Sequence, residues 1–258
     1  MPLWIKPDHL LSVQDVMELM RDHYEGSSMD MTKDIGAGPY ACPYRWRPMT
    51  WSYKGKNYIH ERATATHQTG FSFVAQARSG LPDKFGGILW FGVDDAASSC
   101  YAPIFCGINE IPEQIKEGNG SMVEYSPTAA FWIFTKVSQF AYTRYKDMIV
   151  PIKAKQRELE SKWVTEINNM QQDMLSMFKN NPQQAQRVLN NYSKNAVKEM
   201  CDAWDNLFIY LLVKYHDGNV KKEKDGKFEV TNGVIPHCVF PEQPNYPERW
   251  YEIIVNDC

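Results

Sequence analysis

The sequence lacks most of the motifs that identify an enzyme class at once. It has no cysteine pair spaced as CxxC, no HExxH or GxSxG motif and no phosphate-binding loop. No local motif therefore indicates a zinc finger, a zincin metalloprotease, an α/β-hydrolase or a P-loop protein. The six histidines are dispersed, and none lies two, three or four residues from another. We therefore expect no metal site and no cofactor.

Excess charge and long apolar runs are also missing. The net charge is −3 and the isoelectric point is about 6.1, which argues against a nucleic-acid partner. The longest uncharged apolar runs, such as residues 207–213, are far shorter than the ~20 residues of a membrane helix, so no membrane partner is expected. The first residues do not follow the pattern of a signal peptide. These absences leave the cellular compartment open.

The six cysteines are too sparse for a disulfide framework in a chain of 258 residues, and we expect all of them to be free thiols. They stand at positions 42, 100, 106, 201, 238 and 258.

Three apolar segments follow one another in the first half of the chain. They cover residues 71–77, 86–93 and 100–108, and turn residues separate them. Such runs predict three strands of a sheet that is covered on both faces. The aromatic residues expected to fill much of its core are Phe71, Phe73, Trp90 and Phe91.

The other predicted elements are helices and one hairpin. Ser12 and Asp15 form a capping-box pattern before a short helix, and residues 51–62 read as a β-hairpin. A helix is expected to start with Ser126 as cap and Pro127 in its first turn, and Pro151 is expected to end it. The periodicity after it predicts two antiparallel helices, a helical hairpin at about 152–215.

Sheet segments first and helices afterwards, without βαβ alternation, indicate an α+β fold. The length suits one such domain over residues 1–258.

Four polar residues stand out within the apolar sheet. Gln76 and Arg78 share one side of their strand because side chains repeat every two residues. An amide beside a guanidinium suits a carboxylate or an oxyanion. The alternative is a structural ion pair from Arg78 to Asp94 or Asp95, two carboxylates that a buried segment would not carry without partners.

Arg45, Trp46 and Arg47 form a second candidate group. They are either a surface loop whose arginines stack on aromatic rings or a loop that closes over a site and binds a substrate carboxylate. The sequence pattern does not separate these two interpretations.

Several segments together resemble the second half of PepD-like dipeptidases, which are cysteine peptidases of the N-terminal-nucleophile (Ntn) hydrolase superfamily. The most specific is FVAQARSGLPDKFGGILWFGVDD. The resemblance spans nearly the whole chain and implies an αββα sandwich and hydrolysis of dipeptides that have a free amino terminus. The other segments are MPLWIKP, VMELMRDHYEG, DMTKDIGAGPY, PYRWRPMTW and YAPIFCGI.

The resemblance also implies a nucleophile that this sequence does not provide. An Ntn hydrolase uses the side chain of its first mature residue as nucleophile and its α-amine as base, and in these dipeptidases that residue is cysteine. Here the sequence begins with Met1 and Pro2. We therefore expect this chain to be the C-terminal half of a dipeptidase. It would be a fragment made on purpose, a split gene product or a product of precursor cleavage, and it would be active only when joined to an N-terminal half that carries the cysteine.

Roles and partners follow from this expectation. Arg78 and Gln76 would support the reaction, and Asp94 or Asp95 would fix Arg78 or bind the substrate amine. Expected partners are a dipeptide, the N-terminal half and copies of the chain itself, because half of such a sheet leaves edges and apolar surface uncovered. By resemblance, a periplasmic or secreted location would fit.

Two other functions remain open. One is a non-catalytic binding or scaffold domain that kept the Ntn-hydrolase-like fold. The other is a tautomerase with Pro2 as base, which the retained Met1 disfavours.

Overall fold

The centre of the molecule is a three-stranded antiparallel sheet. The computed structural model describes residues 3–231 and 237–257, and the sheet has the order β3-β4-β5. Its strands are β3 (Phe71–Ala77), β4 (Gly87–Val93) and β5 (Ala102–Phe105), so all three predicted strands are confirmed. A single helical turn, α2 (Asp83–Gly86), stands between β3 and β4.

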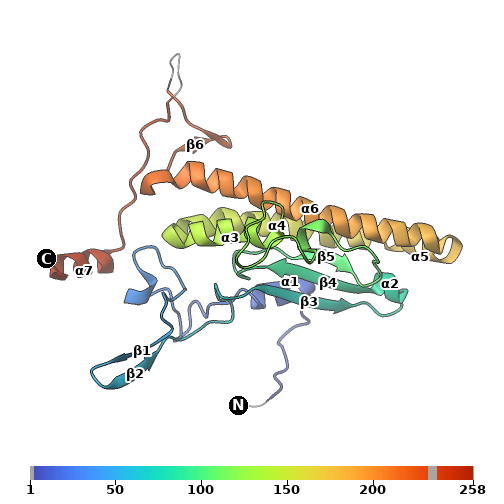
Figure 1. Cartoon of the computed structure of the whole chain (residues 1–258), viewed down its shortest axis with the longest axis horizontal. Helices are drawn as coiled ribbons and strands as arrows, with labels where there is room; N and C mark the ends of the chain where they lie inside the picture. The colour runs from blue at the N-terminus through green and yellow to red at the C-terminus, as the bar shows by residue number, and fades with distance from the viewer. Residues whose placement is uncertain (1–2, 232–236, 258) are drawn as a thin grey trace.

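One face of the sheet is covered and the other is partly open. Side chains of β3 alternate between buried and exposed, which is the pattern of a half-covered strand. Trp90 is buried, but Phe71 and Phe73 are 60% and 49% exposed. The prediction of a sheet covered on both faces is therefore wrong, because the long helices of the described chain pack along one side only (Figure 1).

Four helices supply that cover and most of the remaining core. They are α3 (Ala130–Ala141), α4 (Tyr145–Asn169), α5 (Gln171–Asn180) and α6 (Pro182–Tyr215). The second helix of the pair predicted at about 152–215 corresponds to α6, where the Asn181 side chain accepts a hydrogen bond from the Gln184 amide at 3.1 Å. One hydrophobic cluster runs continuously from the sheet into these helices.

Pro151 lies inside α4, so the prediction that it ends a helix is wrong. A proline removes the hydrogen bond to the carbonyl four residues earlier, which here belongs to Asp147. The Tyr215 hydroxyl donates to that carbonyl at 3.4 Å. A tertiary contact with the end of α6 thus replaces the missing helical bond.

The predicted start at Ser126 is also wrong, because α3 begins at Ala130. The Ser126 hydroxyl donates to Asn119 at 2.6 Å and the Thr128 amide donates to Ser126 at 3.4 Å. The serine therefore ties down the preceding loop and does not cap the helix.

Smaller elements complete the described chain. The capping box at Ser12 and Asp15 is confirmed at the start of α1, and the hairpin of residues 51–62 is confirmed as β1 and β2. These elements are α1 (Val13–Leu19), β1 (Thr50–Tyr53), β2 (Lys56–Ile59), β6 (Glu223–Lys224), β7 (Lys227–Phe228) and α7 (Glu248–Asp257), with 3-10 turns η1 (Ile35–Ala37), η2 (Glu113–Ile115), η3 (Tyr142–Arg144) and η4 (His216–Gly218).

Pro2 and residues 232–236 lie outside the described residues. Among the helices that the structure describes, none has the length and hydropathy needed to cross a bilayer.

Candidate functional site

Arg78 lies just after β3, and its guanidinium binds backbone carbonyls of the next helical turn, α2. Its side chain donates to the carbonyl of Phe85 and, at 3.5 Å, to that of Gly86. The guanidinium carbon lies 4.4 Å from the centre of the Phe85 ring. Burial lowers the pKa of Arg78, and its Nη1 atom is buried without a hydrogen-bond partner. Both N–H groups of this nitrogen are therefore without an acceptor.

Gln76 is oriented by a neighbouring tryptophan. The Trp90 indole nitrogen donates to the Gln76 Oε1 atom at 3.0 Å. Because the amide oxygen is occupied in this way, the amide nitrogen of Gln76 is left as a donor. Gln76 and Arg78 thus keep donor capacity at the same end of the sheet.

Asp94 and Asp95 lie at the opposite end of the sheet. The Arg78 amide pairs with Gly86 and the Asp94 amide pairs with Gly70, so eight residues of strand, about 27 Å, separate the two positions. The predicted contact between Arg78 and either carboxylate is therefore wrong. Antiparallel pairing places the end of β3 beside the start of β4, far from the two aspartates.

Asp94 is a buried carboxyl group at the end of β4. It is 5% exposed, and the Ser138 hydroxyl of α3 donates to it at 2.5 Å. Burial raises the pKa of Asp94 to about 6, with the nearby Asp95 adding to the effect. Its backbone has a φ of +64°, a conformation that aspartate and asparagine tolerate better than most residues.

Asp95 is fully buried and ends a chain of hydrogen bonds that starts at the surface. Its Oδ2 atom accepts from the Tyr44 hydroxyl at 2.6 Å and from Ser98 at 2.9 Å. Tyr44 lies 3.1 Å from Nε2 of His23, whose Nδ1 is 3.3 Å from Glu25. The hydrogen bond to His23 lowers the pKa of Glu25 to about 2. A partly exposed carboxylate is thus linked to a buried one.

Three further polar atoms surround Tyr44 without a hydrogen-bond partner. They are the Tyr142 and Tyr145 hydroxyls and Nδ1 of His67, and their rings lie 5.0–5.9 Å from the Tyr44 ring. Burial lowers the pKa of His67. Unpaired buried polar atoms are uncommon, so this cluster is a polar centre that the sequence pattern did not indicate.

The segment that follows Asp95 is held by side chains from α4 and α6 and by Arg21, which lies in the turn after α1. Arg21 donates to Glu160 at 2.5 Å, and Glu160 accepts from the Tyr101 amide at 2.9 Å. Gln156 and Trp204 donate to carbonyl oxygens of residues 97–99. These contacts fix the connection between β4 and β5 in one position.

The Arg45 guanidinium is buried and pairs with two carboxylates. It lies 2.5 Å from Asp34 and 3.4 Å from Glu61, and it donates to the Met31 carbonyl at 3.0 Å. Arg47 is exposed. The interpretation of this segment as a surface loop is wrong for Arg45, whose bonds already hold residues 31–34 in place.

Three cysteine thiols have raised pKa values and are therefore not activated as nucleophiles. Burial raises the pKa of Cys42 to about 11 and that of Cys201 to about 12, and it places that of Cys100 well above its ordinary value. A nucleophilic cysteine needs a lowered pKa. The prediction of free thiols is confirmed for the five described cysteines, while Cys258 lies outside the described residues.

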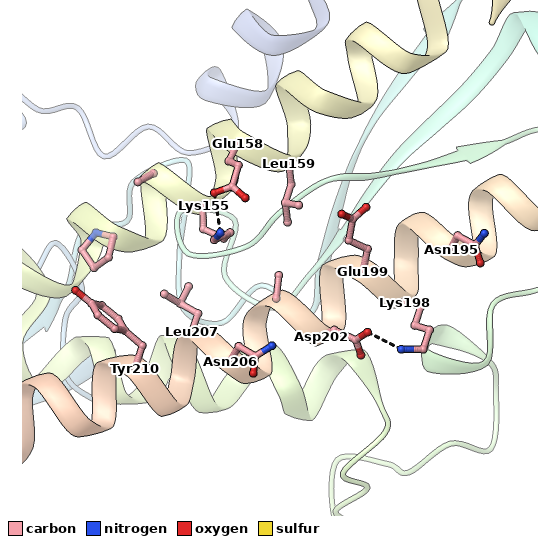
Figure 2. Close-up of a pocket in the computed structure, with 13 residues that line it drawn as sticks. Lys155, Glu158, Leu159, Asn195, Lys198, Glu199, Asp202, Asn206, Leu207 and Tyr210 are labelled. Carbon is pink, nitrogen blue, oxygen red and sulfur yellow. Dashed lines mark hydrogen bonds and ion pairs between the residues drawn. The ribbon is translucent and has the colours of Figure 1, made fainter. Parts of the chain in front are cut away.

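A groove of about 690 Å³ lies between α4 and α6. Figure 2 shows that charged residues line its rim, where Lys155 pairs with Glu158 and Lys198 with Asp202. These charges pair within their own helices, and the groove contains none of the predicted site residues. Across residues 3–231 and 237–257, no group of three histidine, cysteine or acidic side chains could hold a metal ion.

Comparison with protein families assigns the first part of the chain. The model of peptidase family C69 matches residues 1–158, which include the sheet, both aspartates and the first half of α4. A comparison with curated proteins finds no match.

Proposed function

Because the chain belongs to peptidase family C69, we propose that it forms part of a dipeptidase that acts through an N-terminal cysteine. In this proposal the cysteine belongs to a polypeptide segment outside residues 1–258, and the two parts together complete an αββα sandwich in which residues 152–215 form a helical hairpin. The match of the family model to residues 1–158 carries the peptidase assignment. The substrate is a dipeptide with a free amino terminus.

The reaction would proceed by covalent catalysis. The thiolate of the N-terminal cysteine attacks the peptide carbonyl after its α-amine takes the thiol proton. The tetrahedral intermediate collapses, the C–N bond breaks, and the leaving amine receives the proton. Water then hydrolyses the thioester. The developing oxyanion needs donors placed in advance.

Arg78 and Gln76 are the donors that we assign to this oxyanion. Arg78 has a buried Nη1 atom without a partner, and Trp90 leaves the Gln76 amide nitrogen available. Both are held by neighbouring groups, so they would lose little freedom when substrate binds.

The open face of the sheet supports a second layer. Phe71 and Phe73 are largely exposed, and Phe91 stacks on Phe71 with ring centres 5.8 Å apart. An exposed apolar face on a sheet is unusual for a protein that acts alone. A sheet from the proposed N-terminal half would bury it.

The pKa values of the buried thiols also support a nucleophile that lies in another polypeptide segment. Cys42, Cys100 and Cys201 have raised pKa values, so they are protonated at neutral pH. Protonated buried thiols are poor nucleophiles.

Dipeptide hydrolysis tests the proposal. The chain alone, its N-terminal half alone and their mixture are incubated with L-alanyl-L-alanine, and released alanine is measured. Only the mixture should be active, and replacement of the N-terminal cysteine by alanine should abolish activity. Thiol-inhibited activity of this chain alone would contradict the proposal. An inactive mixture that still forms a complex would favour the binding or scaffold function.

A further inference from the structure

The hairpin of β1 and β2 projects from the body of the molecule (Figure 1). Every residue of β2 is exposed, and Trp51 is the one residue of β1 that is partly covered. A two-stranded hairpin is at best marginally stable when nothing packs against it. The hairpin therefore presents a surface that a partner would stabilise.

One face of this hairpin is aromatic. Trp51 stands opposite Tyr58 in the strand register, and their rings stack with centres 5.8 Å apart. Tyr53 lies on the same face, because side chains repeat every two residues, and it is 58% exposed. Aromatic side chains are enriched where proteins bind one another. The composition of this face is therefore that of a protein interface.

The hairpin is also basic, in a chain whose net charge is −3. Residues 46–62 contain four lysine or arginine residues and one acidic residue. Lys56 stands opposite Tyr53 in the register, and Lys54 lies in the turn between the strands. Neither lysine forms an ion pair within the part of the chain that the structure describes. A partner for this face should thus be acidic as well as apolar.

The outer face of α7 has these properties. It carries Glu248, Tyr251, Glu252 and Val255, because residues three or four apart share one face of a helix. All four are exposed, and Val255 is 72% exposed. Two glutamates one turn apart repel each other, and among the described residues neither has an ion-pair partner. Lysines of a partner would relieve this repulsion.

The other side of α7 is already fixed to the molecule. Arg249 donates to the carbonyls of Asp34 at 2.9 Å and of Gly38 at 3.1 Å. It also donates to the carbonyls of residues 32 and 33. Trp250 is half-buried beside the same loop. With these contacts made, the acidic face of α7 stays turned to solvent.

The hairpin and α7 lie at the same end of the molecule (Figure 1). Trp46 and His60, at the base of the hairpin, line one cavity together with Trp250 of α7. The ten residues of α7 span about 15 Å, and the four residues of each hairpin strand span about 14 Å. Two complementary patches at one end can contact each other reciprocally in a two-fold dimer.

We infer that this end of the molecule is a dimer interface, in which the β1–β2 hairpin of one copy packs on the outer face of α7 of a second copy, and the reverse. Lys54 and Lys56 would face Glu248 and Glu252 of the partner subunit, with the aromatic rings between them. This surface is separate from the open face of the sheet, so the dimer would persist when an N-terminal half covers that face. The dimer does not depend on the proposed function.

Charge reversal on each side tests the interface. Lys54→Glu/Lys56→Glu reverses the hairpin, and Glu248→Lys/Glu252→Lys reverses α7. Both are made in a chain that carries Phe73→Ser, which removes an exposed ring from the sheet face. Sedimentation velocity should show dimers of the Phe73→Ser chain and association at least about tenfold weaker for each charge variant, because like charges then face each other. A monomeric Phe73→Ser chain, or charge variants that dimerise as well as it does, would overturn the inference.

An equimolar mixture of the two charge variants separates a lost contact from a misfolded chain. In the mixed dimer each reversed hairpin meets a reversed α7, and each unchanged hairpin meets an unchanged α7, so opposite charges face each other at both contacts. The mixture should therefore dimerise about as well as the Phe73→Ser chain. A mixture that stays monomeric would overturn the inference.

The matched control is Lys222→Glu/Lys224→Glu, which makes the same change of charge at two exposed lysines in and beside β6. It should leave the dimer unchanged. An equal loss of dimer in this control would show an effect of net charge alone and would also overturn the inference.

Discussion

At the scale of single residues, Asp94 combines a buried carboxyl with a left-handed backbone. Burial raises its pKa from 3.8 to about 6, so the folded state holds the proton more tightly than the unfolded state. Stability is therefore fully retained below pH ~4 and falls as the pH rises to ~6, by about 2–3 kcal/mol for a shift of this size. Above pH ~6 Asp94 is ionised in both states, so the free energy of unfolding stays at this lower value.

Replacing Asp94 by asparagine should remove this loss. Asparagine tolerates positive φ, and its oxygen can still accept from Ser138. Urea unfolding should give a variant that is more stable by up to ~2–3 kcal/mol at pH 7.5 and unchanged near pH 4. Asp202→Asn, at an exposed position of α6, is the control and should show no such difference. A stabilisation equal at both pH values would contradict the argument.

Arg78 gives a second prediction at this scale. In the reconstituted enzyme, Arg78→Ala should lower kcat/KM for dipeptides by ~10²–10³-fold, as loss of an oxyanion donor does in comparable sites. Arg187→Ala, at an exposed position of α6, should leave the rate unchanged. Because Arg78 also binds two carbonyls, thermal unfolding of both variants separates misfolding from lost chemistry. Turnover by Arg78→Ala within a few-fold of normal would contradict the assignment of Arg78 as an oxyanion donor.

Individual contacts were harder to predict than residue types. The sequence singled out Gln76, Arg78 and both aspartates, but it could not tell which of them meet. The register that separates Arg78 from Asp94 depends on a whole strand pair. Tyr44 gave no signal, because a tyrosine in a loop does not show in sequence which carboxylate it will contact.

At the scale of elements, the ion pair of Arg21 and Glu160 joins the turn after α1 to α4. Glu160→Gln should destabilise the chain by ~3 kcal/mol, because it leaves a buried guanidinium without its main counter-charge. Denaturant unfolding measures the loss. The control is Glu199→Gln, which breaks the surface pair with Lys162 and should cost less than ~1 kcal/mol. Similar losses for both would show that the buried pair has no special role.

Element types followed from local periodicity, and element ends did not. Apolar runs located β3, β4 and β5, and the periodic spacing of apolar residues located α6. The helix continues through Pro151 because the Tyr215 hydroxyl that compensates for it comes from 64 residues further along the chain, which local sequence does not show. The start of α3 differs from the prediction because Ser126 bonds to its own loop.

At the scale of the whole molecule, the uncovered sheet face predicts self-association when the chain is alone. Sedimentation velocity at increasing concentration should show oligomers, and Phe73→Ser should reduce them because it removes an exposed ring from this face. Ile209→Ser on α6, where the side chain is 56% exposed, is the matched control. A concentration-independent monomer of the unmodified chain would contradict this prediction.

The α+β class followed from the order of elements, and the family model agrees with the resemblance in the sequence. The layer arrangement could not be predicted in the same way. Whether both faces of a sheet are covered depends on what packs against it, and strands of similar composition occur with one or two covered faces.

The contacts of Arg249 also set an order of events during synthesis. The arginine lies more than 200 residues after the carbonyls of residues 32–38 that it binds. On the ribosome, the early loop emerges long before its partner, so these hydrogen bonds must wait until more than 200 further residues have been translated. The junction between α7 and this loop would therefore form well after the loop itself has been synthesised.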